Sequence, residues 1–229
     1  GSDINEFGRE NLGYLPEDRG LYQKQKLEET IHYFGILRGL DKEEARSRAS
    51  MWLERFSLID QGNRKIEELS KGNQQKIQFI LALLHDPGLL ILDEPFTGLD
   101  PLNQLLLKEI IQEKRDEGKT IVFSTHQMEQ VELLCTNICL INKGKIVVEG
   151  VLDDIRKTHT SDAVEVRYSG TLENDKVRSF FTEVEIKETT LSGILKQKPD
   201  RFLSWVNSQV TVESFQVKVP SLEQIFIEE

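Results

Sequence analysis

The chain has 229 residues, 38% of them hydrophobic, which is enough for one large domain or for one domain with a small appendage. Asp and Glu outnumber Lys and Arg by 39 to 29, so the formal net charge is -10 and the overall field repels a phosphate backbone. Nucleic acid is therefore not an expected partner, unless a local basic patch overrides this average.

The apolar stretches are too short to cross a membrane. The most apolar one, Phe79–Leu84, falls far short of the roughly 20 residues that a transmembrane helix needs. The first residues lack the basic and apolar regions of a signal peptide. The two cysteines, Cys135 and Cys139, lack the Cys-x-x-Cys spacing of a metal or redox site. We expect a cytoplasmic protein in which both cysteines are reduced and packed.

The segment from Lys24 to about Leu84 predicts mainly helices. One helix is expected over Leu27–Leu40, and the next begins at Asp41, whose carboxylate can cap it while Glu44 reaches back. Apolar residues then recur at helical spacing and predict a buried face, formed by Ala45, Ala49, Trp52, Leu53 and Phe56. We interpret these residues as core rather than as a cofactor site.

Beyond Pro87 the pattern changes to strands that alternate with helices. The apolar run Leu89–Leu92 is typical of a strand buried on both faces, and it ends at Asp93 and Glu94. The next strand is expected over Thr120–Ser124. This alternation predicts an α/β sheet whose ligands bind at the carboxyl ends of its strands.

The helix between these two strands has clear end signals. Asp100 can cap it, Pro101 suits its first position and Gly118 suits its end. Its predicted inward face consists of Leu102, Leu105, Leu106 and Ile110.

After a further helix from about Gln127, the chain turns to short strands. A hairpin is expected from Ile138–Ile141 and Lys145–Val148. The last third of the chain predicts a separate small α+β domain. Strands are expected over Val164–Tyr168 and Val210–Val219, and a helix over about Arg201–Asn207. Ser221 predicts the cap of a last helix that packs onto this domain through Leu222, Ile225 and Phe226.

Two segments carry candidate chemistry. Asp93 and Glu94 end a buried strand, where they can hold a magnesium ion and an attacking water beside a phosphate. A strand end followed by helix-capping acids explains the same residues. Ser70 and the Gly72 backbone lie at a helix amino end, where unsatisfied N–H groups favour an anion. A serine cap with a glycine turn explains them equally well.

Four segments in chain order resemble the signature, Walker B, D-loop and switch-histidine motifs of the ABC ATPase family. They are Leu69–Asn73, Leu90–Pro95, Thr97–Asp100 and Ser124–His126. Upstream, Gly13–Glu17 resembles the segment that contains the family's Q-loop. A chance match of four motifs in family order and at family spacing is very improbable.

The resemblance implies a domain organisation. Residues 1–155 are expected to form a partial P-loop NTPase sheet of the α/β class, with a helical subdomain over about 24–86. Residues 156–229 resemble the accessory domain of bacterial exporter-type ATPases, including those similar to sodium or drug efflux subunits.

The resemblance also assigns roles at one ATP site. It implies that Asp93 helps to hold Mg²⁺, that Glu94 is the general base for the attacking water, and that His126 contacts the terminal phosphate of ATP. As a lone residue, His126 is more often a structural histidine; its place after a strand end reverses that preference.

A second ATPase subunit is implied as a partner. Ser70 and Gly72, together with Lys71 and Asn73, are expected to bind the terminal phosphate of ATP held by that subunit in a head-to-tail dimer. Asp100 is expected at the dimer contact, although helix capping alone also explains it.

The sequence departs from the family at several points. The phosphate loop Gly-x-x-x-x-Gly-Lys-Ser/Thr is absent ahead of the Q-loop, so we expect a shortened form that binds ATP poorly. We reject Gly118–Thr120 as this loop, because Glu113 replaces its first glycine and a strand follows it. Glu17 stands where the family usually has a metal-sensing glutamine, and Lys71 and Asn73 replace the usual glycine and glutamine of the signature.

The resemblance implies an ATP hydrolase that powers transport through permease subunits, located on the inner face of the cell membrane. Two alternatives stay open. One is a non-catalytic regulatory or docking module, which retention of Glu94 and His126 argues against. The other is an ABC ATPase outside transport, whose relatives usually carry two such domains or a long coiled coil.

Overall fold

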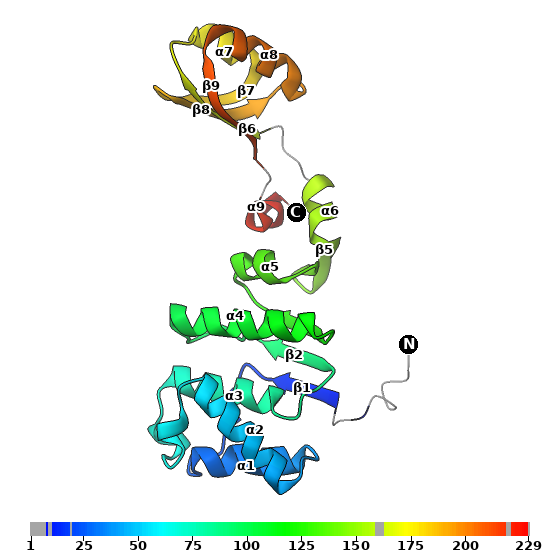
Figure 1. The fold of residues 1–229 in the computed structure, drawn as a ribbon. Coiled ribbons are helices and arrows are strands. Elements are labelled where there is room, and N and C mark those ends of the chain that lie inside the picture. The colour runs from blue at the N-terminus through cyan, green and yellow to red at the C-terminus, as the bar shows by residue number, and fades with distance from the viewer. Residues whose placement is uncertain (1–7, 9–10, 19, 159–162, 219–220, 229) are drawn as a thin grey trace. The chain divides into compact units, whose positions relative to one another are not determined.

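The computed structural model describes residues 8, 11–18, 20–158, 163–218 and 221–228 (Figure 1). They belong to two compact units, residues 1–130 and 131–229. The sequence analysis puts the boundary at 155, so the two divisions differ in where they assign residues 131–155.

A parallel three-stranded sheet lies at the centre of the first unit. Its strands are β1 (Leu12–Leu15), β2 (Leu89–Asp93) and β3 (Thr120–Ser124), and β2 lies in the middle. The predicted α/β arrangement is therefore present. The register sets Asp93 beside Ser124 at the carboxyl end of the sheet.

One face of this sheet is buried and the other is not. Leu90 and Leu92 of β2 are buried, whereas Tyr14, Ile91 and Val122 lie in register on the opposite face and are 50%, 36% and 54% exposed. The expectation that Leu89–Leu92 is buried on both faces is therefore wrong for the described residues. A continuous apolar run permits burial on two faces, but it does not supply the second covering layer.

Helices form the stretch between β1 and β2. They are α1 (Leu27–Leu37), α2 (Lys42–Arg55) and α3 (Lys71–Leu83), with short 3-10 helices at Ile59–Gln61 and Ile66–Glu68. The predicted apolar face of α2, from Ala45 to Phe56, is buried throughout.

The ends of α1 and α2 differ in detail from the prediction. Helix α1 ends at Leu37 rather than Leu40, because Gly39 adopts a positive φ of 95°. Asp41 caps α2 as predicted, accepting a 2.8 Å hydrogen bond from the Glu44 amide. The Glu44 carboxylate accepts from Arg48 at 2.7 Å rather than turning back to the cap.

Helix α4 (Pro101–Asp116) connects β2 with β3. Asp100 caps it, with its Oδ1 accepting from the Asn103 amide at 3.0 Å, and Gly118 follows it with φ +85°. The predicted inward face is wrong at Leu102 and Leu105, which are 78% and 53% exposed. The buried positions are Leu107, Ile110 and Ile111. Because the helix is rich in leucine, its sequence offers two overlapping apolar stripes, and periodicity alone cannot choose between them.

A hairpin follows the helix at which the second unit begins. Helix α5 (Met128–Leu134) leads to β4 (Asn137–Asn142) and β5 (Lys145–Val151), which pair antiparallel, and α6 (Leu152–Thr158) follows. Lys143 and Gly144 both have positive φ, as a two-residue hairpin turn requires. The predicted hairpin is confirmed.

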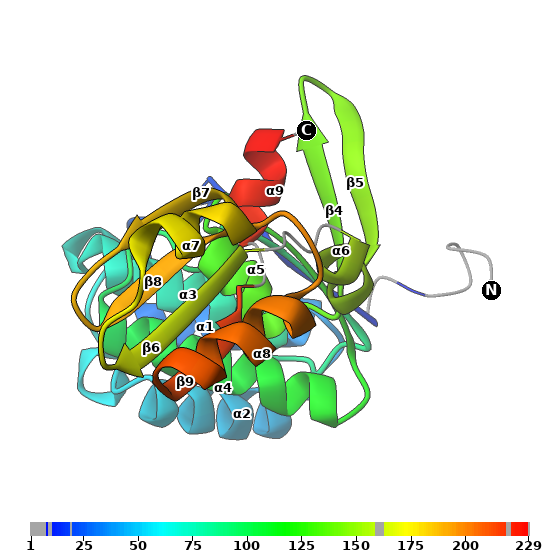
Figure 2. The same ribbon diagram turned by 90° about the horizontal axis from the view of Figure 1, so that it is seen from above.

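The following segment is an antiparallel four-stranded sheet with two helices. Its elements are β6 (Ala163–Ser169), α7 (Asn174–Phe180), β7 (Phe181–Ile186), β8 (Thr190–Leu195), α8 (Pro199–Gln209) and β9 (Thr211–Val217). The strand order β7-β8-β6-β9 is that of a split β-α-β fold. Helices α7 and α8 cover the same face of the sheet (Figure 2). An α+β segment is thus present, although the sequence analysis missed α7, β7 and β8.

The last helix, α9 (Leu222–Glu228), contacts α5. The Leu222 amide donates to Glu132 Oε1 at 2.7 Å, and Glu132 also pairs with Arg156 of α6 at 3.0 Å. Leu222 and Ile225 are buried, but among the described residues the buried cluster of the four-stranded sheet includes neither. The predicted packing of this helix onto the α+β domain is therefore wrong.

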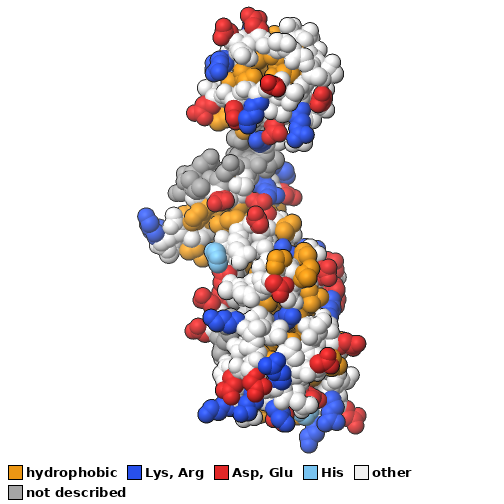
Figure 3. Space-filling model, turned by 90° about the vertical axis from the view of Figure 1, so that its left-hand side faces the viewer, with side chains coloured by type: hydrophobic (Ala, Val, Ile, Leu, Met, Phe, Trp, Pro, Cys, Tyr) orange, Lys and Arg blue, Asp and Glu red, His pale blue; other side chains and the backbone are white. Residues whose placement is uncertain are grey.

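On the face drawn in Figure 3, acidic and basic side chains are interspersed, with hydrophobic side chains between them. Within the described ranges, no helix combines the length and the apolar character that a membrane crossing needs.

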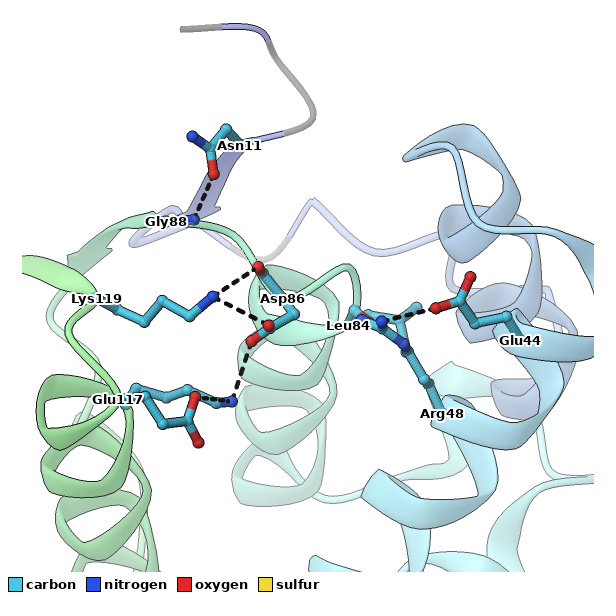
Figure 4. Close-up of polar contacts among 9 residues, drawn as sticks. Asn11, Glu44, Arg48, Leu84, Asp86, Gly88, Glu117 and Lys119 are labelled. Carbon is cyan, nitrogen blue, oxygen red and sulfur yellow. Dashed lines mark hydrogen bonds and ion pairs between the residues drawn. The ribbon is translucent and has the colours of Figure 1, made fainter.

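A polar cluster holds the amino ends of the strands. Asp86 lies between α3 and β2 with φ +55°, and its carboxylate pairs with Lys114 at 3.1 Å and with Lys119 at 3.0 Å (Figure 4). Next to it, Asn11 Oδ1 accepts from the Gly88 amide at 2.7 Å. This edge is opposite to the one that carries Asp93.

We predict that Asp86→Asn lowers the free energy of unfolding at pH 7 by roughly 0.5–1 kcal/mol, a range set by the partial exposure of the pairs. Burial raises the pKa of Asp86, but the hydrogen bonds from Lys119 and Lys114 outweigh it and hold the pKa below its ordinary value. Because the folded pKa is depressed, this stabilisation exists above the unfolded pKa of about 3.9 and is lost as the pH falls below it. Asparagine tolerates the positive φ.

Urea denaturation of both proteins at several pH values measures this effect. The matched control is Asp116→Asn, which removes an exposed carboxylate paired with Arg115. If Asp86→Asn lowers the free energy of unfolding by the same amount at pH 7 and at pH 3, the account is contradicted.

The two cysteines differ in environment. Both are free thiols; Cys135 is half-buried, whereas Cys139 is exposed, so the expectation that both are packed is wrong for Cys139. Burial raises the pKa of Cys135 to about 11. At pH 8 only a small fraction of Cys135 is then a thiolate, the form that reacts.

We therefore predict that a thiol reagent at pH 8 modifies Cys139 rapidly and Cys135 slowly, and that the Cys139→Ser protein lacks the rapid phase. Reaction at Cys135 should rise about tenfold per pH unit up to its pKa. Peptide mapping after timed labelling measures both sites, and equal rates at pH 8 contradict the burial of Cys135.

Candidate functional site

Polar residues gather where the parallel strands end. Glu17 follows β1, Asp93 ends β2, and Ser124 ends β3, with His126 two residues further on. Because β1, β2 and β3 are parallel, these positions share one edge of the sheet. Glu17 is exposed at this edge.

The end of β2 is tied to the end of β3. The Ser124 hydroxyl donates a hydrogen bond to Asp93 Oδ1, and the Glu94 amide donates to the Ser124 carbonyl at 3.1 Å. Asp93 is partly buried. The pairing therefore fixes the direction of the Asp93 carboxylate and starts the turn that follows β2.

Glu94 has the left-handed backbone, with φ +44°, which is uncommon for a residue with a side chain. Its Oε1 accepts from the His126 amide at 3.0 Å and lies 2.7 Å from His126 Nδ1. Its Oε2 accepts from the hydroxyls of Thr97 and Thr125, each at 3.3 Å. Backbone strain of this kind persists only where surrounding contacts hold it, and such positions cluster at functional sites.

Glu94 and His126 differ in access to solvent. The Glu94 side chain is 17% exposed, whereas that of His126 is 77% exposed. A shielded carboxylate with its two oxygens held at fixed places suits the orientation of a water molecule. The exposed imidazole suits contact with a ligand that arrives at the strand ends.

The predicted anion site begins α3. The Ser70 hydroxyl caps the helix by accepting from the Asn73 amide at 3.2 Å, and the first turn contains no acidic residue. Lys71 is exposed there. A Cβ on Gly72 would lie 3.1 Å from the Gly98 carbonyl oxygen, so the backbones of the two segments approach closely. This helix end offers N–H groups, a positive dipole end and an ammonium group.

The structure thus brings Glu94 and His126 into contact, with Asp93 at the same strand end. The Ser70–Asn73 segment approaches Gly98, four residues after Glu94, through Gly72. Asp100 serves as the cap of α4. The hydrogen bonds from the Asn103 amide and from its side chain hold the pKa of Asp100 below its ordinary value. Helix capping, one of the two roles expected for Asp100, is therefore observed.

Sequence reasoning assigned no role to several groups that hold this site. Ser124, Thr97 and Thr125 orient the two acids, and Gln75 donates to the backbone that follows Asp93. The threonines and the serine lie inside or beside the quoted motifs. Gln75 lies two residues beyond the Leu69–Asn73 motif, and its local sequence does not reveal which backbone segment it contacts.

The donors at this edge fit a magnesium ion. Asp93 and Glu94 supply carboxylate oxygens, and Ser124 supplies a hydroxyl oxygen. Among the described residues, no three His, Cys, Asp or Glu side chains are grouped so that they alone could hold a metal ion. Mg²⁺ prefers oxygen ligands, keeps several waters, and takes one or two carboxylates together with substrate phosphates. Asp93 is the residue that would hold it.

Two family models match the chain. One, described as "AAA domain, putative AbiEii toxin, Type IV TA system", matches residues 14–132. The other, described as "ATP-binding protein DrrA1-3-like, C-terminal domain", matches residues 150–229.

Two solved structures have a similar fold. A solved ATP-binding subunit of an ABC transporter aligns with a TM-score of 0.62 and 34% identity, over 68% of this chain and 65% of that one. A dimeric ATP-binding cassette, MJ0796, bound to ADP and phosphate, aligns with a TM-score of 0.58 and 24% identity, over 66% of this chain and 68% of that one. These alignments define a fold of the P-loop NTPase class.

An ABC transporter ATP-binding protein of Bacillus subtilis, YhaQ, is 43% identical over all of this chain and 77% of its own length. The chain belongs to the family of ABC transporter ATP-binding proteins.

We predict that Ser70→Ala lowers the free energy of unfolding by about 1 kcal/mol, whereas Ser70→Gly costs only a few tenths. The reason is that alanine leaves the Asn73 amide without its capping oxygen. Urea denaturation measures both variants. Equal stability of Ser70→Ala and the unchanged protein means that the cap does not form in solution.

Proposed function

We propose that this chain is the catalytic part of a transporter subunit that hydrolyses ATP and drives export through permease subunits in the membrane. The observation that carries the proposal is the fixed Glu94 carboxylate beside the exposed His126 ring. A purely structural part has no need for a shielded acid held by four donor groups.

In the proposed reaction, water attacks the terminal phosphorus of ATP and the bond to the bridging oxygen breaks, so that ADP leaves. Glu94 orients the attacking water and takes its proton. His126 contacts the terminal phosphate. Asp93 would hold Mg²⁺, which supplies positive charge to the phosphate oxygens. Positioning and electrostatic stabilisation then account for most of the rate.

A second subunit completes the proposed site. Ser70, Lys71, Gly72 and Asn73 bind the terminal phosphate of the ATP that this second subunit holds, with Asp100 at the contact between subunits. The helix amino end and the exposed Lys71 support this assignment. The ATP-binding cassette MJ0796, a dimer bound to ADP and phosphate, is a precedent for such an arrangement.

The proposed partners are permease subunits, so that the protein lies on the inner face of the cell membrane. The helical subdomain, about residues 24–86, transmits the motion of the dimer, and Glu17 lies next to it. Export rather than import is proposed because residues 156–229 resemble the accessory domain of exporter-type ATPases, and a DrrA1-3-like model matches this region. The net charge of -10 disfavours nucleic acid.

A second candidate is a regulatory or docking module without catalysis, against which the retention of Glu94 and His126 argues. The printed sequence contains no Gly-x-x-x-x-Gly-Lys-Ser/Thr segment. Gly118–Thr120 does not replace it, because Gly118 follows α4 and Thr120 begins β3, the reverse of a phosphate loop. Copurification with membrane subunits would separate transport from this role and from an ABC ATPase outside transport.

We predict that the chain as printed binds magnesium-ATP weakly and turns over no appreciable ATP, because backbone and lysine contacts to the phosphates are lacking. In the extended protein, defined here as this chain with a family phosphate-loop segment ahead of residue 1, binding should appear. Calorimetric titration of both proteins measures this difference.

The control is the extended protein with the phosphate-loop lysine replaced by alanine, which should bind as weakly as the printed chain. Tight binding of ATP by the printed chain alone would show that the nucleotide site has been placed wrongly. Absence of binding by the extended protein would favour the regulatory module.

A further inference from the structure

Helix α3 buries three polar side chains within about one turn. Gln75, Lys76 and Gln78 are 4%, 7% and 5% exposed. Burying such groups is costly unless they form hydrogen bonds. Each of them reaches the backbone of a different segment.

Gln75 reaches the segment that carries the general base. Its Nε2 is shared between the Pro95 carbonyl at 3.4 Å and the Glu94 carbonyl at 3.5 Å. We call residues Glu94–Gly98 the Glu94 loop. The contact therefore acts at the residue whose backbone has the unusual positive φ.

Gln78 lies one turn further along α3. Its Nε2 donates to the Asp18 carbonyl at 3.2 Å, in the segment Pro16–Asp18 that follows β1, which we call the Glu17 loop. Its Oε1 is buried and has no hydrogen-bond partner among the described residues. Lys76 donates to the carbonyl of Phe56 at the end of α2, at 3.4 Å.

The same helix begins with the anion site at Ser70, and its Gly72 packs against the Gly98 carbonyl of the Glu94 loop. Helix α3 thus includes most of the signature segment, Leu69–Asn73, in its first turn. It contacts the Glu94 loop through Gln75 and the Glu17 loop through Gln78. A rigid helix with discrete contacts can carry a displacement from one end to the other.

We propose that Gln75 and Gln78 are positioning residues, through which α3 holds the Glu94 loop and the Glu17 loop in register with the signature segment. A phosphate bound at the start of α3 would then act on the Glu94 carboxylate of the same chain through Gln75. This inference deepens the proposed function and rests on it for its catalytic meaning, whereas the placement of Glu94 by Gln75 is testable without ATP.

The test uses hydrogen exchange of the chain as printed, read by NMR at single amides. The His126 amide donates to Glu94 Oε1 and the Thr97 amide donates to the Glu94 carbonyl, so both report where Glu94 is held. Gln75→Met keeps the volume but removes the donor. We expect exchange at His126 and Thr97 to rise about tenfold, with the exchange of β3 amides unchanged.

Gln74→Met is the matched control. Gln74 is adjacent in the same helix, and its Nε2 also donates to two backbone carbonyls, those of Ile66 and Leu69. This variant should leave the His126 amide unchanged. Gln78→Met should shift the resonance of the Gly20 amide, which donates to the Asp18 carbonyl, and likewise leave His126 unchanged. Gln75→Leu repeats the test if the methionine variant does not fold.

Three outcomes overturn the inference: unchanged exchange at His126 in the Gln75 variant, an equal rise in the Gln74 variant, or a rise that also affects the β3 amides. In the extended protein, Gln75→Met should lower kcat about tenfold with KM for ATP changed less than about twofold. A parent protein that hydrolyses no ATP would count against the proposed function alone, and the exchange result would stand.

Discussion

The parallel pairing of β2 with β3 is the constraint on which the candidate site depends. It sets Ser124 beside Asp93 and lets the Glu94 amide donate to the Ser124 carbonyl. From that turn Glu94 takes its positive φ, and its carboxylate accepts from the His126 amide. A change in this register by one residue would separate the acid from the histidine, because alternate side chains of a strand point to opposite faces.

The two ends of the sheet have different tasks. At the amino ends, Asp86 with its two lysines and the Asn11 contact fix where the strands begin. At the carboxyl ends, Asp93, Glu94 and His126 are held by hydrogen bonds at the place where we propose that ATP is hydrolysed. Helix α3 runs between the Ser70 segment and the Asp86 cluster, so it links the proposed phosphate contact to the rest of the first unit.

Much of this arrangement could be predicted from local signals. The Asp41 and Asp100 caps, the hairpin turn at Lys143 and the alternating strands each depend on a few neighbouring residues. The wrong or missing predictions concern contacts that depend on a packing partner far away in the sequence. Leucine-rich α4 offers two apolar stripes, the run Leu89–Leu92 does not reveal which of its faces is covered, and the contact of Gln75 depends on a segment twenty residues away. Such long-range contacts leave little trace in a single sequence.

The central claim is that Glu94 is the general base, and one measurement tests it most directly. The single-turnover rate of ATP hydrolysis is compared between the extended protein and its Glu94→Gln variant, with ATP binding measured in parallel. The account predicts that the rate falls by about 10²–10⁴-fold while binding is retained. A Glu94→Gln protein that hydrolyses ATP at nearly the parent rate would contradict it.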